Sequence, residues 1–310
     1  MVYDIHSFAC VKGFFQEQGM ARSKKASKSK PDRQLTHGDV MQASVRVDPA
    51  LRRRSQLLWE DRGQATRGPK AGFSPEEVVR AAMKIADDDG LSAVTMNAVA
   101  SKLGLTTMAV YRYFPNKDAL LDAIIDAGMG LPPLPAQPRK PWREEVADWA
   151  RAKRAMLIAR PWLAELPFVA APHGPNFLLW LEALLDPLSR TGLPAADLGE
   201  MISIVDGFTR GTSDTAISLA RAHARGISTE EWAAAVGADL GRAIGDPRFP
   251  KFAALLTAPQ TGKGRSMDES FDFNLERVLD GIELYVRESG ERGTGKRGSG
   301  RTATAGTGDG

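Results

Sequence analysis

The sequence predicts an all-α protein in which a helix-turn-helix domain of three helices precedes a larger helical domain. Between residues 73 and 289, apolar residues recur every three or four positions, and the alternation typical of strands is absent. Segment 131–141 holds five prolines in eleven residues, and no helix can cross it. We therefore expect a stiff proline-rich linker between a domain at 73–130 and a domain at 142–289.

The composition excludes several classes of protein. The chain has 310 residues, of which 43% are hydrophobic and 25% are charged, and these are values of globular proteins. No apolar run approaches the roughly 20 residues that a membrane-spanning helix needs. The single cysteine, Cys10, and four scattered histidines argue against a disulfide framework, a metal site or a cofactor. We expect a soluble, cytoplasmic protein with no membrane partner.

The charge of the chain is unevenly distributed. Residues 1–72 contain 14 Lys and Arg against 7 Asp and Glu, whereas residues 73–290 are mildly acidic. Residues 1–72 lack sustained periodicity, so we expect a disordered basic extension that contacts a polyanion. If translation starts at Met20, residues 1–19 have no function. The Gly-rich segment 290–310 is expected to be a disordered tail. Its glycine patterns follow no strand and are not read as nucleotide sites.

Helix signals are densest between residues 73 and 130. Ser74 precedes Pro75, and Glu77 stands three positions after the serine, a complete helix start. Thr95 is expected to cap a second helix at 96–103, and Gly104 can adopt the left-handed conformation that ends it. Two short helices joined by a glycine turn and held by a preceding helix predict a helix-turn-helix.

The third helix has the composition of a helix that reads DNA. It is predicted over residues 107–114, with Thr106 as its cap and Pro115 as its stop, and Asn116 caps a fourth helix. Val110 and Phe114 are expected to face the core. The residues expected to face outward, where they reach bases and phosphates, are Thr107, Ala109, Tyr111, Arg112 and Tyr113. Lys117 adds a positive charge beside the N-terminus of the fourth helix.

Residues 95–121, read as TMNAVASKLGLTTMAVYRYFPNKDALL, resemble the DNA-binding domain of the tetracycline-repressor family of transcriptional regulators. The shared features are a threonine before the second helix, Leu-Gly in the turn, a Tyr-x-x-Phe and an Asn-Lys-x-x-Leu-Leu. The resemblance implies DNA contacts by Thr95, Thr106, Thr107, Ala109, Tyr111, Arg112, Tyr113 and Lys117. Met96 stands where some members carry a base-reading side chain, but a methionine cannot make bidentate hydrogen bonds.

The larger domain resembles the tetracycline-repressor subclass more loosely, and this resemblance implies a ligand pocket and a dimer interface. Aromatic and apolar side chains could line a pocket for a small apolar or amphipathic effector. These candidates are Trp149, Phe168, Phe177, Trp180, Leu181, Leu184 and Phe208, each of which could instead fill the core. The helix around 198–224 and the apolar stripe on 271–285 are expected to pair with their symmetry mates in a homodimer.

Together these features predict a repressor rather than an enzyme. A homodimer would bind a palindromic double-stranded operator, and an effector would favour a conformation with the two reading heads too far apart. No nucleophile–base pair or carboxylate cluster suggests catalysis. Three alternatives remain: an activator, a constitutive regulator without a ligand, and a helical protein-interaction adaptor.

Overall fold

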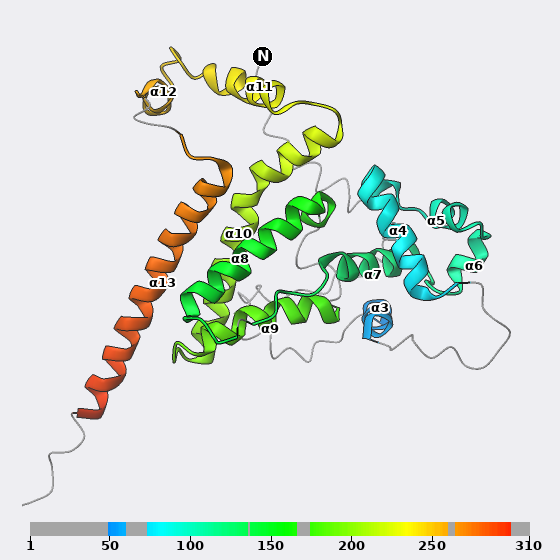
Figure 1. The fold of residues 1–310 in the computed structure, drawn as a ribbon, viewed down its shortest axis with the longest axis horizontal. Helices are drawn as coiled ribbons and strands as arrows, with labels where there is room; N and C mark the ends of the chain where they lie inside the picture. Colours follow the sequence, from blue (N-terminus) through cyan, green and yellow to red (C-terminus); the bar gives the residue numbers. More distant parts are fainter. Residues whose placement is uncertain (1–48, 60–72, 136, 166–173, 260–263, 299–310) are drawn as a thin grey trace, which may run out of the picture. The chain divides into compact units, whose positions relative to one another are not determined.

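The computed structural model describes residues 49–59, 73–135, 137–165, 174–259 and 264–298, which all belong to one unit spanning residues 46–310. These residues form helices and connecting turns, without a strand among them (Figure 1). The helices are, in order, α3 (Pro49–Trp59), α4 (Pro75–Asp89), η2 (Leu91–Ala93), α5 (Met96–Leu103), α6 (Thr107–Tyr111), α7 (Lys117–Met129), α8 (Trp142–Ala159), η3 (Pro161–Glu165), α9 (Pro175–Ser189), α10 (Ala195–Ala224), α11 (Thr229–Gly241), α12 (Pro250–Thr257) and α13 (Met267–Gly298).

Helices α4 to α7 enclose a small apolar core. The Ser74 hydroxyl accepts from the Glu77 amide, and the Glu77 carboxylate accepts from the Ser74 amide, so α4 begins with the predicted capping box. Val78 of α4, Val99 of α5 and Leu120 of α7 are fully buried, and α4 packs against both α5 and α7. This core fixes the direction in which α5 and α6 face solvent.

Helix α3 corrects the prediction that residues 1–72 are disordered. It packs against α7, where the Arg54 guanidinium donates two hydrogen bonds of 2.6 Å to the buried carboxylate of Asp122. Burial raises the pKa of Asp122 above its ordinary 3.8, although the hydrogen bond from Arg54 lowers it. Leu57 adds an apolar contact with the core. The other residues to which that prediction applies, 1–48 and 60–72, lie outside the described residues.

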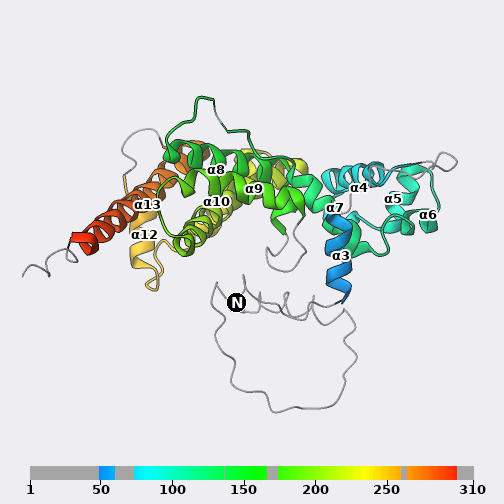
Figure 2. The ribbon, with the colours of Figure 1, turned by 90° about the horizontal axis from the view of Figure 1, so that it is seen from below.

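The larger helical domain is built on α8, α9 and α10, which pack against one another (Figure 2). As predicted, no helix crosses the proline-rich segment, and α8 begins directly after it at Trp142. Trp149 of α8 and Trp180 of α9 meet edge to face, with ring centroids 5.8 Å apart. The Trp149 indole N–H donates to the Trp180 carbonyl, and the Trp180 indole N–H donates to the carbonyl of Gly130 after α7.

Helix α13 returns along α10 and also faces α8 through ion pairs. Three arginines of α8 pair with a line of carboxylates on α13. These pairs are Arg143 with Glu276, Asp280 and Glu283, Arg151 with Asp272, and Arg154 with Asp268. The helix continues to Gly298, so the expected disordered tail at 290–310 is wrong for its first nine residues. Residues 299–310 lie outside the described residues.

The apolar stripe of α13 has a different role from the predicted one. Phe271, Leu275 and Ile282 are buried in the core of the same chain, where Phe271 contacts Phe208 of α10. The expectation that this stripe pairs with a symmetry mate is therefore wrong. None of the described helices is both long enough and apolar enough to cross a lipid bilayer.

Candidate nucleic-acid interface

The turn between α5 and α6 has the predicted geometry. Gly104 adopts the left-handed conformation, with φ 66° and ψ 30°, and the Leu105 amide donates to the Ala100 carbonyl over 2.9 Å. The Thr95 hydroxyl accepts from the Ala98 amide over 3.1 Å, and the Thr106 hydroxyl accepts from the Ala109 amide over 3.3 Å. Both predicted caps are therefore confirmed, and the short helices are fixed relative to each other.

Helix α6 is anchored by its inner face. Val110 and Phe114 have no exposed surface, as expected. The helix ends at Tyr111 rather than at residue 114, and the following residues form a turn in which the amide of Phe114 donates to the Val110 carbonyl. The reason is Pro115, since a proline disfavours helical backbone at the residue before it.

The outer face of α6 and the residue after it present three exposed side chains, one of which is a cation. Tyr111 has 42% of its surface exposed, and Arg112 is exposed with a guanidinium that makes no ion pair or hydrogen bond with other described residues. Met108 is the missed member of this face, with 72% of its surface exposed. The exposure of Met108 could have been predicted from its position, because a residue two positions from the buried Val110 lies nearly opposite it on a helix.

The remaining predicted contact residues divide into exposed and half-buried ones. Thr95, Thr106 and Lys117 are exposed at the N-termini of α5, α6 and α7, while Thr107 and Ala109 are half-buried. The Thr107 hydroxyl donates to the Asn97 side chain over 3.3 Å, so Asn97 is a second residue of this surface that the sequence analysis did not single out.

Two members of the predicted set are directed inward. The Tyr113 hydroxyl donates to the Phe73 carbonyl over 2.8 Å, and its ring packs against the core, so the expectation that it faces outward is corrected. Met96 is only 7% exposed and belongs to the apolar core. Its burial follows from its place on the inner side of α5, next to Val99 and Ala100.

The comparisons with known proteins cover both helical domains. Residues 78–124 match the profile described as bacterial regulatory proteins, tetR family, and residues 134–286 match the one described as tetracyclin repressor-like, C-terminal domain. The HTH-type transcriptional repressor DrrR1 of Streptomyces coeruleorubidus is 31% identical over 240 residues, covering 77% of this chain and 87% of that protein. The chain belongs to the tetracycline-repressor family.

Other members of the family extend the comparison. The tetracycline repressor protein class A from transposon 1721 of Escherichia coli is 30% identical over 141 residues, covering 45% of this chain and 65% of that protein. Apo ActR from Streptomyces coelicolor shares the fold, with a TM-score of 0.57 at 22% identity, over 71% of this chain and 100% of that chain.

The predicted effector residues do not share one environment. Trp180 and Leu184 are buried in the core, whereas Phe177 and Leu181 are half-buried on α9. Trp149 is buried but borders a cleft beneath the proline-rich segment. Phe208 lies at the contact between α10 and α13, and Phe168 lies outside the described residues.

A buried ion pair joins α8 to α10 beside the two tryptophans. The Lys153 ammonium lies 3.6 Å from the Asp206 carboxylate, and both side chains are over nine-tenths buried. The same ammonium lies 5.6 Å and 5.3 Å from the centroids of the Trp149 and Trp180 rings. Burial lowers the pKa of Lys153 below its ordinary 10.5, against the raising effect of Asp206. This pair could not be predicted from the sequence, because its members lie far apart along the chain.

Helix α7 connects the helix-turn-helix to the larger helical domain. Its Asp126 carboxylate accepts from the amides of Phe177 and Asn176 over 3.0 and 3.3 Å, so it caps the N-terminus of α9. Burial raises the pKa of Asp126, although these two N–H groups lower it. The Trp162 indole N–H of η3 donates to Asp87 at the end of α4 over 2.8 Å. These contacts join α9 and η3 to helices α7 and α4.

Proposed function

We propose that this protein is a transcriptional repressor that binds operator DNA as a homodimer and releases it when a small molecule binds the C-terminal helical domain. The observation that carries the proposal is the outer face of α6, where Tyr111, Arg112 and Met108 are exposed beside the capped N-terminus of the helix. The division into domains at 73–130, 131–141 and 142–289 is part of this proposal. Such a regulator works in the cytoplasm, at the nucleoid.

Each helix of the helix-turn-helix domain is proposed to supply a different contact with DNA. A guanidinium such as that of Arg112 binds guanine or phosphate, and exposed Met108 can contact a thymine methyl group. Thr95, Thr106 and Lys117 lie at helix N-termini, whose free amides bind phosphate oxygens. We leave Met96 and the Tyr113 hydroxyl out of the proposed contacts, because the first is buried and the second is already bonded.

The homodimer is proposed to form through faces of α10 and α13 that remain exposed in the single chain. Ile204 of α10 is 45% exposed and Leu284 of α13 is 58% exposed. Gly207 and Gly211 of α10 and Gly281 of α13 would have no atom within 4 Å of an added Cβ, so a second helix can approach closely. A two-fold pairing here would place two α6 helices about 34 Å apart, one turn of the duplex.

Selection from a random DNA pool tests the proposal on the full chain. We expect enrichment of an inverted repeat with half-sites about one helical turn apart, and an affinity that falls with salt. Enrichment of no sequence would contradict operator recognition and would favour the adaptor. In a compound screen against the selected complex, an effector that relieves repression must bind the free protein more tightly than the DNA complex, by the factor through which it weakens DNA binding. Equal affinity for both would exclude ligand relief.

A further inference from the structure

A cleft lies between the proline-rich segment and the outer sides of α8 and α9. Its volume is about 450 Å³, within the range of about 300 to 1,000 Å³ for small-molecule sites. Leu131 and Leu134 of the segment and Leu179 of α9 form much of its apolar wall. These side chains are 73%, 90% and 44% exposed. Large aliphatic side chains are thus left in contact with water around a hollow.

The cleft is held open from both ends of the segment. At one end, the Trp180 indole N–H donates to the Gly130 carbonyl over 3.1 Å. At the other end, Arg139 pairs with Glu145 of α8 and Asp186 of α9. The guanidinium of Arg139 holds the pKa of Glu145 below its ordinary 4.5. The segment is therefore anchored on both sides of its two exposed leucines, and the cleft exists before a ligand arrives.

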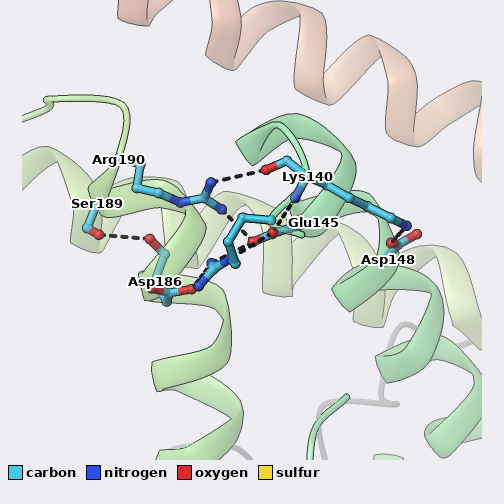
Figure 3. A network of polar contacts seen from close by, with 7 residues as sticks. Lys140, Glu145, Asp148, Asp186, Ser189 and Arg190 are labelled. Atoms are coloured by element: carbon cyan, nitrogen blue, oxygen red, sulfur yellow. Dashed lines mark hydrogen bonds and ion pairs between the residues drawn. The ribbon is translucent and has the colours of Figure 1, made fainter. Parts of the chain in front are cut away.

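Further ion pairs fix the rim of the cleft. Arg190 of α9 also pairs with Glu145 and donates to the Lys140 carbonyl over 3.1 Å. The Lys140 ammonium pairs with Asp148 of α8 over 2.6 Å (Figure 3). These contacts pair most of the charged groups around the opening with one another. They fix the rim, and the paired groups are not free to bind a ligand.

One carboxylate of the lining remains uncompensated. Glu182 is exposed on α9, and its carboxylate makes no ion pair or hydrogen bond with other described residues. Among the described residues, the lining contains four carboxylates, Glu145, Asp148, Glu182 and Asp186, but one cation, Arg139. An apolar cleft with one free carboxylate at its rim complements a molecule with an apolar body and a positive charge.

We propose that this cleft binds an amphipathic amine, with its apolar body against Leu131, Leu134 and Leu179 and its ammonium beside Glu182. Trp149 of the predicted effector set also lines this cleft, whereas Trp180 and Leu184 of that set are buried in the core. Binding here does not depend on the proposed DNA-binding function, and it is measured on the full chain without DNA.

Three fluorescent probes with one dansyl body test the proposal by fluorescence anisotropy. They are dansylcadaverine, which is a cation, its neutral N-acetyl derivative, and the anion dansyl-aminohexanoate. We expect the cation to bind about fivefold more tightly than the neutral probe, the effect of one partly exposed ion pair. Glu182→Gln should abolish this preference, while Glu144→Gln, an exposed glutamate of α8 outside the cleft, should leave it intact.

The apolar wall is tested separately. Leu134→Ser and Leu131→Ser should each weaken all three probes about tenfold, since each removes a large apolar contact at a position too exposed to affect folding. Probes that bind equally regardless of charge, or that bind the anion best, would overturn the assignment of an amine. Binding that neither leucine variant weakens, or no saturable binding of dansylcadaverine, would overturn the site itself.

Discussion

The pair of Lys153 and Asp206 places two charged groups in the interior of the larger helical domain. Both groups are removed from water, and one oxygen of Asp206 has no hydrogen-bond partner in the described part of the chain. Removing two charges from water costs more free energy than a contact of 3.6 Å returns, although the two tryptophan rings beside the ammonium offset part of that cost. The pair therefore limits stability and contributes to a specific packing of α8 on α10.

Single and double replacements of this pair distinguish the cost of breaking the ion pair from the cost of burying it. Lys153→Met should lower the free energy of unfolding by about 3–5 kcal/mol, because it removes the ammonium that pairs with the buried Asp206 carboxylate. The double variant Lys153→Met/Asp206→Leu should be neutral or more stable than the parent by about 1–4 kcal/mol. Urea unfolding measures both. A double variant as unstable as the sum of the two single variants would contradict this account.

The same pair predicts a pH dependence. Because burial lowers the pKa of Lys153, the unfolded chain holds this proton at pH values where the folded chain has released it. The contribution of Lys153 to stability therefore rises with pH between its folded pKa and the ordinary 10.5, and is flat below that interval. Urea midpoints between neutral and alkaline pH should show this rise in the parent and lack it in the double variant. Equal slopes would contradict the assignment.

Gly174 is the residue whose size is most tightly fixed. A Cβ there would overlap the carboxylate of Asp126, which is held by the amides of Asn176 and Phe177. Gly174→Ala should therefore cost about 1–3 kcal/mol in unfolding free energy. Gly237→Ala on α11 is the control, since a Cβ there meets nothing within 4 Å and should stabilise the helix by about 1 kcal/mol. Similar stabilities for the two variants would show that the Asp126 side chain can move aside at no cost in free energy.

At the scale of elements, local signals were predictable from the sequence and long-range ones were not. Ser74, Thr95, Thr106 and Asn116 cap the helices that they were expected to cap, because a cap depends on residues within one turn. Helix α3 was missed, since eleven residues with a polar composition become helical only when packing against α7 supports them.

The candidate site shows the same division. The exposure of Tyr111 and Arg112 followed from helical spacing, but the hydrogen bond from Tyr113 to Phe73 joins residues forty positions apart. The arginines of α8 and the carboxylates of α13 are more than a hundred positions apart, so their pairing could not be seen in the sequence either. Periodicity also could not distinguish a stripe of α13 buried in its own chain from one that faces a second chain.

The attachment of α3 involves Arg54, which pairs with Asp122 and Asp118 of α7, and Leu57, which packs against the core. Arg54→Ala leaves the buried Asp122 without its donor, and we expect a loss of about 1–3 kcal/mol in unfolding free energy. The released helix should also be cut faster by trypsin at the neighbouring arginines. Arg53→Ala, an exposed position on the same helix, is the control and should change neither quantity. Equal behaviour of the two variants would mean that α3 is not held by Arg54.

At the scale of the whole molecule, the proposed binding of a palindromic operator requires a homodimer with two helix-turn-helix domains. Ile204→Arg and Leu284→Arg place charges on the exposed faces of α10 and α13, where they should convert the dimer to a monomer and weaken operator binding. Sedimentation velocity measures the oligomeric state. Ala155→Arg, on an exposed position of α8, is the control and should leave the dimer unchanged. A dimer that persists in both interface variants would place the interface elsewhere.

The central claim is that the outer face of α6 reads DNA, and fluorescence anisotropy on the DNA flanking the gene for this protein tests it most directly. The parent protein should bind this DNA more tightly than unrelated DNA. Tyr111→Ala/Arg112→Ala should lose at least about thirtyfold in affinity, the effect of two contacts of about 1 kcal/mol each, with its fold unchanged by circular dichroism. Ser92→Ala, exposed on η2, should bind like the parent. Specific binding that survives the double substitution would contradict the claim.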